Sequence, residues 1–129
     1  MRRELTDHIV VGDSVNNQLT IEVLDEPGQG GACHEYRIAI PMDFLSGGWG
    51  KSFTNIRFQN GPIKEWGLNG ITHETLLAIL IDRLEGFQSG EFACEDNAIA
   101  LSHVKEALMY LQKRTQGRIQ RGVEGTNVR

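Results

Sequence analysis

Residues 72–122 read THETLLAILIDRLEGFQSGEFACEDNAIALSHVKEALMYLQKRTQGRIQRG and predict two helices folded back on each other around a short loop. Thr72 is a typical N-cap residue for the first helix. This helix is expected to end near Gln88, because Ser89 and Gly90 are poor helix residues. Apolar side chains recur along it at helical spacing and give it one continuous apolar face: Leu76, Leu77, Leu80, Ile81, Leu84 and Phe87.

The second helix is expected to begin between residues 94 and 97 and to run to Arg121, where Gly122 can adopt the left-handed conformation of a helix end. About 25 helical residues reach about 37 Å, so the end of this helix should project beyond its shorter partner. Its apolar stripe becomes cationic without changing face. Four apolar residues are followed at helical spacing by three arginines: Leu101, Val104, Leu108, Leu111, Arg114, Arg118 and Arg121.

Upstream of the helices, the chain alternates apolar and polar side chains with the period of β-strands. Residues 15–23 and 36–44 carry this pattern on either side of a glycine-rich break, so we expect a β-hairpin. The segment SGGWG at residues 46–50 indicates a second turn, and residues 53–59 indicate a third main strand. Pro41 suggests an edge or bulge position, because proline cannot donate to a strand ladder. A short apolar run at residues 9–11 is either an edge strand or a frayed arm.

The hydrophobic period changes from 2 to about 3.6 across the glycine-rich connection at residues 61–70. The predicted fold class is therefore α+β, with a small N-terminal antiparallel β-sheet within residues 15–60 and a long C-terminal antiparallel helical hairpin within residues 72–121. A chain of 129 residues with 40% apolar residues suits one small domain, residues 1–129.

Composition narrows the classes of protein. The two cysteines, Cys33 and Cys94, show neither metal-site spacing nor a disulfide framework, and the first residues lack the apolar run of a signal peptide, which indicates a reducing cytosol. No apolar run approaches the roughly 20 residues of a membrane-spanning helix. The net charge of −4 argues against a polymeric nucleic acid as partner, since such binders are usually basic over a whole face.

Against this acidic background, residues 113–121 carry four positive charges and no acid. One interpretation is a helix C-terminus decorated with cations that favour the helix dipole. The dipole does not require a common face, however, and placing Arg114, Arg118 and Arg121 together costs a few tenths of a kcal/mol of repulsion per pair. A small anionic ligand would offset that repulsion, so the arginines are candidate ligand-binding residues.

Phe87 and Phe92 flank the loop between the helices, where the simplest interpretation is that they are lids on the apolar core of the hairpin. The functional alternative is that one of them stacks on a planar base while Asn97 offers its amide to the base edge. The four histidines lack metal-ligand spacing, and we find no nucleophile with a partner base, so we predict no metal site, no cofactor and no catalytic residue. A small-molecule binding module fits better than an enzyme.

Three segments carry a resemblance to a known family: FQNGPIKEWGLNG, LLAILIDRLEGFQSGEFACEDNAIAL and KRTQGRIQRGVEGT, which together cover residues 58–126 with interruptions. They resemble the Thoeris anti-defence sponges of phages, whose C-terminal helical hairpin is shared with anti-CBASS sponges. The resemblance implies a phage protein in the cytoplasm of the infected bacterial host that sequesters, without cleaving, the glycocyclic ADP-ribose made by TIR-domain enzymes. Some members also hold cyclic oligonucleotides at separate sites.

The same resemblance places the base-stacking aromatic of the family on Phe87, its polar pocket residue on Asn97, and its two helix arginines on Arg114 and Arg118. It also implies a homo-oligomer, either a dimer or a dimer-based hexamer. Two other functions stay open. One is a phage structural or regulatory protein whose arginines bind an acidic partner or nucleic acid. The other is a nucleotide-cleaving enzyme that uses acidic residues of the hairpin: Asp82, Glu85 or Glu91.

The expected distances constrain the pocket. Arg118 lies 21 residues along the second helix from Asn97, which is about 31 Å at 1.5 Å per residue. One small nucleotide cannot span that distance. The aromatic end and the arginine end can share a pocket only if a second copy packs antiparallel to the first, which predicts two equivalent pockets in a dimer.

Overall fold

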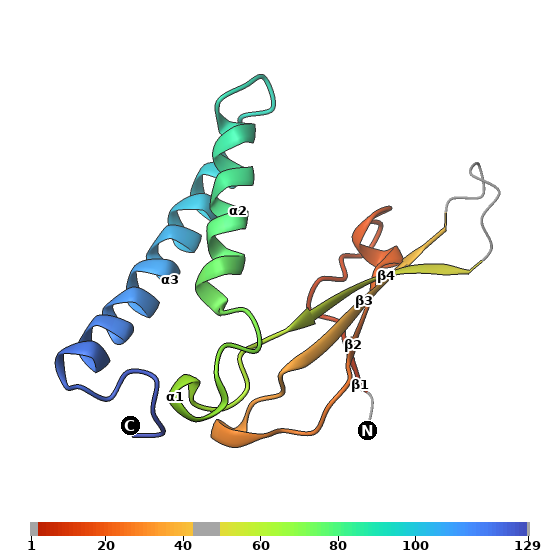
Figure 1. Cartoon of the computed structure of the whole chain (residues 1–129). Helices are drawn as coiled ribbons and strands as arrows, with labels where there is room; N and C mark the ends of the chain where they lie inside the picture. Colours follow the sequence, from red (N-terminus) through yellow and green to blue (C-terminus); the bar gives the residue numbers. More distant parts are fainter. Residues whose placement is uncertain (1–2, 43–49, 129) are drawn as a thin grey trace. The chain divides into compact units, whose positions relative to one another are not determined.

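The computed structural model describes residues 3–42 and 50–128, and it confirms the α+β fold class (Figure 1). The chain divides into two compact units, Met1–Asn60 and Gly61–Arg129. The division falls at the start of the predicted glycine-rich connection. The first unit contains the β-sheet and the second contains the helices. The expectation of a single domain stays a prediction.

The sheet has four antiparallel strands in the order β1-β2-β3-β4, with bounds Arg3–Leu5, Thr20–Val23, Glu35–Pro41 and Lys51–Arg57. The predicted hairpin is formed by β2 and β3, and β4 is the predicted third strand. Ile21 pairs with Ile38 and Val23 pairs with Tyr36, so the alternating apolar residues share one face. Val23 is fully buried at this face.

The sheet departs from the predicted strands in two places. The apolar run at residues 9–11 forms turns, and the edge strand is instead the shorter β1. Residues 15–18 lie in and beside a 3₁₀ turn, Asn16–Gln18, rather than at the start of a strand. The Asp13 carboxylate accepts hydrogen bonds at 2.6 Å from the backbone N–H groups of Val15 and Asn16. These bonds hold the pKa of Asp13 below its usual range, and they stabilise the turn against the strand.

Pro41 does not lie in an edge strand, because β3 pairs with β2 on one side and with β4 on the other. Pro41 is the last residue of β3 and pairs with Lys51, whereas the last pair between β2 and β3 is Thr20 with Ala39. Its missing N–H therefore falls where only one neighbouring strand remains. The predicted strand residue Phe44 and most of the predicted turn at 46–50 lie outside the described residues.

The segment between β2 and β3 is held by one carboxylate. Asp25 accepts hydrogen bonds of 2.9 to 3.1 Å from the backbone N–H groups of His34 and Glu35. Burial raises the pKa of Asp25, but these bonds and the neighbouring His34 ring outweigh burial and leave the pKa below its usual range. The Asp25 carboxylate is thus paired at this turn, whereas the buried Nδ1 of His34 has no hydrogen-bond partner among the described residues.

The second unit contains α1, Ile63–Trp66, and two long helices, α2, His73–Gln88, and α3, Glu95–Gln120. The predicted helix bounds are confirmed. The Thr72 hydroxyl accepts from the backbone N–H of Thr75, and the Cys94 thiol accepts from that of Asn97. Gly122 ends α3 with a φ of 74°. Helix α1 lies inside the connection that the sequence predicts to be a loop; it follows Pro62 and ends at Trp66, with Gly67 as its C-cap.

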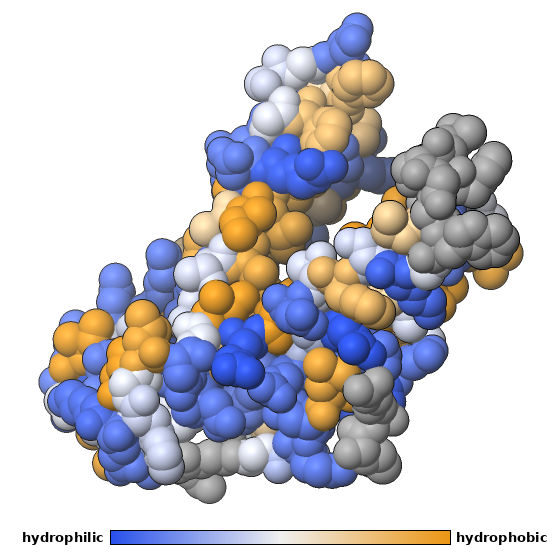
Figure 2. Space-filling model, turned by 45° about the vertical axis from the view of Figure 1, so that its right-hand side comes forward, coloured by the Kyte–Doolittle hydropathy of each residue, from blue (hydrophilic) through white to orange (hydrophobic). Residues whose placement is uncertain are grey.

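Neither α2 nor α3 contains a buried residue, although both have an apolar face. The stripe residues of α3 are only half-buried, and several other apolar side chains of the hairpin are exposed. Figure 2 shows apolar side chains on the visible surface of the hairpin. No helix among the described residues has both the length and the apolar character needed to cross a membrane.

Candidate anion-binding site

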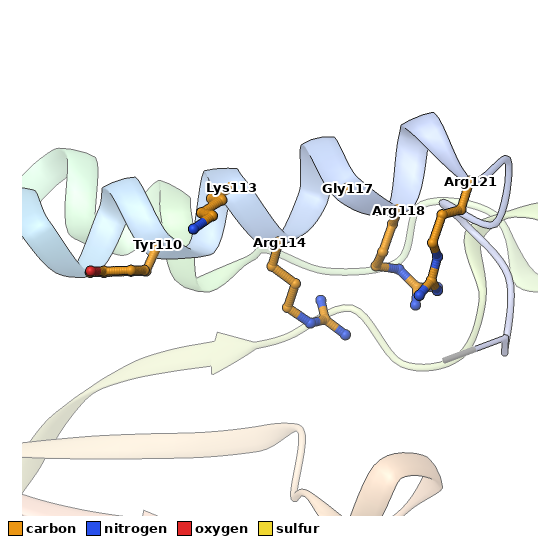
Figure 3. A pocket seen from close by; sticks show the side chains of 6 residues that line it. All are labelled: Tyr110, Lys113, Arg114, Gly117, Arg118 and Arg121. Atoms are coloured by element: carbon orange, nitrogen blue, oxygen red, sulfur yellow. The ribbon is translucent and has the colours of Figure 1, made fainter.

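The C-terminal part of α3 carries an open hollow of about 580 Å³. The six residues that line it all come from this helix and the residue that caps it: Tyr110, Lys113, Arg114, Gly117, Arg118 and Arg121. The side chains of the three arginines extend to one side of the helix (Figure 3). The structure therefore brings the three predicted arginines together, and no carboxylate of the described residues lines the hollow.

The hollow is electrostatically suited to an anion. Four of its six lining residues are cationic, whereas the whole chain has a net charge of −4. The helix C-terminus contributes roughly half a negative charge, which stabilises the cations but is too small to neutralise them. An anion in this hollow would meet a locally positive surface on an acidic protein.

The arginines differ in what they bind within the chain. Arg114 is exposed and makes no hydrogen bond or ion pair with the residues that the structure describes. Arg118 is half-buried and donates to three backbone carbonyls of residues 123–128. Arg114 can meet a ligand without giving up a partner, whereas Arg118 cannot.

Two further lining residues extend the predicted site. Gly117 lies between the arginines, and a Cβ placed on it would meet no atom within 4 Å, so the missing side chain leaves part of the hollow open. Tyr110 packs under the Lys113 ammonium, which lies 5.9 Å from the centre of its ring. Tyr110 is not among the predicted site residues, although its position four residues before Arg114 places it on the same face.

The two predicted residues at the loop end have a different environment. Phe87 is 39% exposed near the end of α2, and the Arg83 guanidinium carbon lies 5.2 Å from the centre of its ring. Asn97 is half-buried in the first turn of α3. The Gln88 side chain bonds to both the N–H and the C=O of Cys94 at 3.1 Å and ties the end of α2 to the start of α3. The end of α2 and the start of α3 are thus held together by side-chain hydrogen bonds.

The structure does not bring Phe87 and Asn97 to the arginines within one chain. Helix α3 is continuous over 26 residues, with Asn97 in its first turn and Arg118 in its last. Their separation along the axis is about 31 Å, as the sequence predicted. The predicted ligand-binding residues therefore lie in two groups within one chain, one at the aromatic loop end and one at the arginine end.

We also looked at the acidic residues of the hairpin as candidates for nucleotide cleavage and for metal binding. Of the acidic residues considered for cleavage, Glu85 forms an exposed ion pair of 3.9 Å with Lys105, while Asp82 and Glu91 are exposed. Among the described residues, no three histidine, cysteine or acidic side chains are grouped so that they could hold a metal ion.

Comparison with known proteins gives two findings. Residues 51–116 match the family model described as Acb2/Tad1, hairpin domain, which spans β4, both shorter helices and most of α3. The chain is also similar to "Thoeris anti-defense 1" from Bacillus phage SBSphiJ7, with 53% identity over 72 residues. That alignment covers 56% of this chain and 51% of the relative, so the chain spans about half the length of the curated relative it matches.

Proposed function

We infer the function of this chain from its family: it belongs to the Acb2/Tad1 hairpin domain family, whose model matches just over half of its length. We propose that it is an anti-defence protein that binds and holds a cyclic nucleotide immune signal without cleaving it. The proposed ligand is glycocyclic ADP-ribose, with cyclic oligonucleotides as a further class at separate sites. The proposed place of action is the cytoplasm of an infected bacterial host. The relative named Thoeris anti-defense 1 supports the anti-defence role.

The observation that carries this proposal is the hollow on α3, which is lined by four cations and, within residues 3–42 and 50–128, by no carboxylate. Phosphate groups are small, doubly or singly charged anions that arginine binds through two parallel hydrogen bonds. We propose that Arg114 and Arg118 hold the phosphates of the ligand and that Arg121 adds positive charge. Lys113 contributes as a point charge at the edge of the same hollow.

The remaining contacts come from the loop end of a second copy. Phe87 stacks on the base, and Asn97 bonds to the base edge through its amide. The half-buried stripe of α3 supports association, because α2 and α3 contain no buried residue to complete an apolar core. We therefore propose a dimer with two equivalent pockets as the smallest complete unit, with a dimer-based hexamer as its larger form.

The test is ligand recovery. Purified protein in excess is incubated with glycocyclic ADP-ribose, the free ligand is measured after filtration, and the protein is then denatured by heat. Depletion followed by recovery of intact ligand supports the proposal. Recovery of fragments would identify an enzyme, and a ligand that is never depleted would overturn the proposed function.

Two variants make this test specific to the hollow. Arg114→Ala removes the cation that has no partner among the described residues, so we expect depletion to weaken at least about tenfold. Lys105→Ala removes one positive charge from the same helix outside the hollow, where it forms only an exposed ion pair. It should deplete the ligand like the parent protein. Equal losses in both variants would show that net charge, rather than the hollow, determines binding.

A further inference from the structure

The segment that follows α3 folds back onto the helix that it leaves. The Val123 backbone N–H donates to the Arg118 carbonyl at 3.0 Å, and the Thr126 N–H donates to the Val123 carbonyl at 3.1 Å. The Thr126 hydroxyl also donates to the Val123 carbonyl and accepts from the Val128 N–H. We call residues 122–128 the C-terminal strap.

The Arg118 guanidinium holds this strap through three carbonyls. Its Nη2 donates to Val123 and Thr126 at 3.0 Å each, and its Nη1 donates to Val128. A guanidinium offers two edges for bidentate binding, Nη1 with Nη2 and Nε with Nη2, and both edges need an Nη2 hydrogen. Because both Nη2 hydrogens are given to the strap, Arg118 has no bidentate edge left for a phosphate.

A second anchor fixes the strap to α1. The Lys64 backbone N–H donates to the Gly125 carbonyl at 3.2 Å. Gly125 has a φ of 80°, and a Cβ added to it would lie 2.7 Å from Cγ2 of Ile63. A residue with a side chain would therefore face both a strained backbone and a steric clash at this position. The close fit depends on glycine.

We propose that the C-terminal strap and a ligand phosphate compete for Arg118. The strap carbonyls satisfy the guanidinium in the unliganded protein, and a phosphate that takes both Nη2 hydrogens releases the strap from α3. The strap thereby lowers the apparent affinity of the site by the fraction of molecules in which it is closed. This inference rests on the proposed function only where it identifies the phosphate as part of a cyclic nucleotide.

The first experiment loosens the strap without touching the hollow. Gly125→Ala and Thr126→Ala alter residues that do not line the hollow, so neither removes a ligand contact. Each variant should bind the nucleotide more tightly in calorimetry, by about fivefold where the closed strap dominates. Gly12→Ala is the matched control, since Gly12 has a φ of 86° and no atom within 4 Å of an added Cβ. It should leave affinity unchanged.

The second experiment observes the strap directly by amide hydrogen exchange in the full chain. Glycocyclic ADP-ribose and inorganic pyrophosphate are each added at saturating concentration. We expect faster exchange at the amides that hold the strap, those of Lys64, Thr126 and Val128. Arg118→Lys should accelerate the same amides without any ligand, because an ammonium cannot reproduce the planar fork.

The outcomes separate the two proposals. If the nucleotide binds while these amides keep their protection and the two strap variants bind like the parent, the competition is wrong and the proposed function stands. If the nucleotide does not bind but pyrophosphate opens the strap, the competition stands and the proposed function fails. If neither anion changes exchange at the strap, the competition is overturned.

Discussion

The two ends of the helical hairpin differ in charge and in how their side chains are used. Residues 84–104, around the loop, contain four acids and no lysine or arginine: Glu85, Glu91, Glu95 and Asp96. Residues 113–121 contain four cations and no acid. Phe87 and Asn97 belong to the first end, and the arginines that line the hollow belong to the second.

This difference is the physical reason for the proposed dimer, because one copy alone would carry only half of the proposed pocket. A nucleotide needs an aromatic surface for its base and cations for its phosphates, and α3 holds these groups about 31 Å apart. Opposite charges at the two ends favour an antiparallel pair of hairpins, in which each acidic end lies beside a basic end. The attraction acts over about 10 Å at ordinary ionic strength, so it orients the pair rather than holding it together.

The largest expected effect comes from the arginine end. The double variant Arg114→Ala, Arg118→Ala should weaken nucleotide binding by about a hundredfold or more, because each charge-assisted contact is worth about 1.5 to 3 kcal/mol. Calorimetric titration of a folded double variant measures the loss. Arg114→Lys keeps the charge but not the planar fork, so its loss should be smaller. A double variant that bound glycocyclic ADP-ribose like the parent would rule out the site.

The aromatic loop end should contribute less to nucleotide binding than the arginine end. Phe87→Ala removes base stacking worth about 1 to 3 kcal/mol, so we expect binding to weaken about tenfold. The fold should be retained, because the Phe87 side chain is 39% exposed and its described ring partner, the Arg83 guanidinium, is also on α2. Thermal unfolding provides the control. Unchanged affinity would mean that Phe87 is only a lid on the hairpin, the simpler interpretation of its sequence position.

The sequence predicted the hairpin well because helix signals are local. The 3.6-residue period, the Thr72 cap and the left-handed Gly122 all lie within the segments that they define. The missed features depend on partners elsewhere. Strand β1 is only three residues long, too short to show alternation, whereas the more apolar residues 9–11 form turns. The competing role of Arg118 was also hidden, because its partners are backbone carbonyls, which every residue carries.

Mixing two weakly binding variants tests whether the ends of two copies form one pocket. A Phe87→Ala copy paired with an Arg114→Ala copy contains one pocket with both groups intact and one pocket that lacks both. Random exchange of subunits should therefore restore about a quarter of all pockets. Equilibrium binding to the mixture, compared with each variant alone, measures the recovery. Light scattering tests for the proposed dimer, whose mass should be about twice the monomer mass of 14.4 kDa. A mixture that bound no better than its components would place each pocket within a single copy.

The smallest expected effect on nucleotide binding comes from Gly117, which lines the hollow without a side chain. Gly117→Ala and Gly86→Ala each place a Cβ on a helix where no atom lies within 4 Å, so both should stabilise the protein, by up to about 1 kcal/mol of helix propensity. Of these two glycines, only Gly117 lines the hollow. If the missing side chain admits the ligand, Gly117→Ala should weaken nucleotide binding a few-fold while Gly86→Ala leaves it unchanged. Unfolding midpoints and calorimetry on the same samples separate the two effects. Equal affinities in the two variants would show that the ligand does not approach this part of α3, and the hollow would then hold it by the arginine side chains alone.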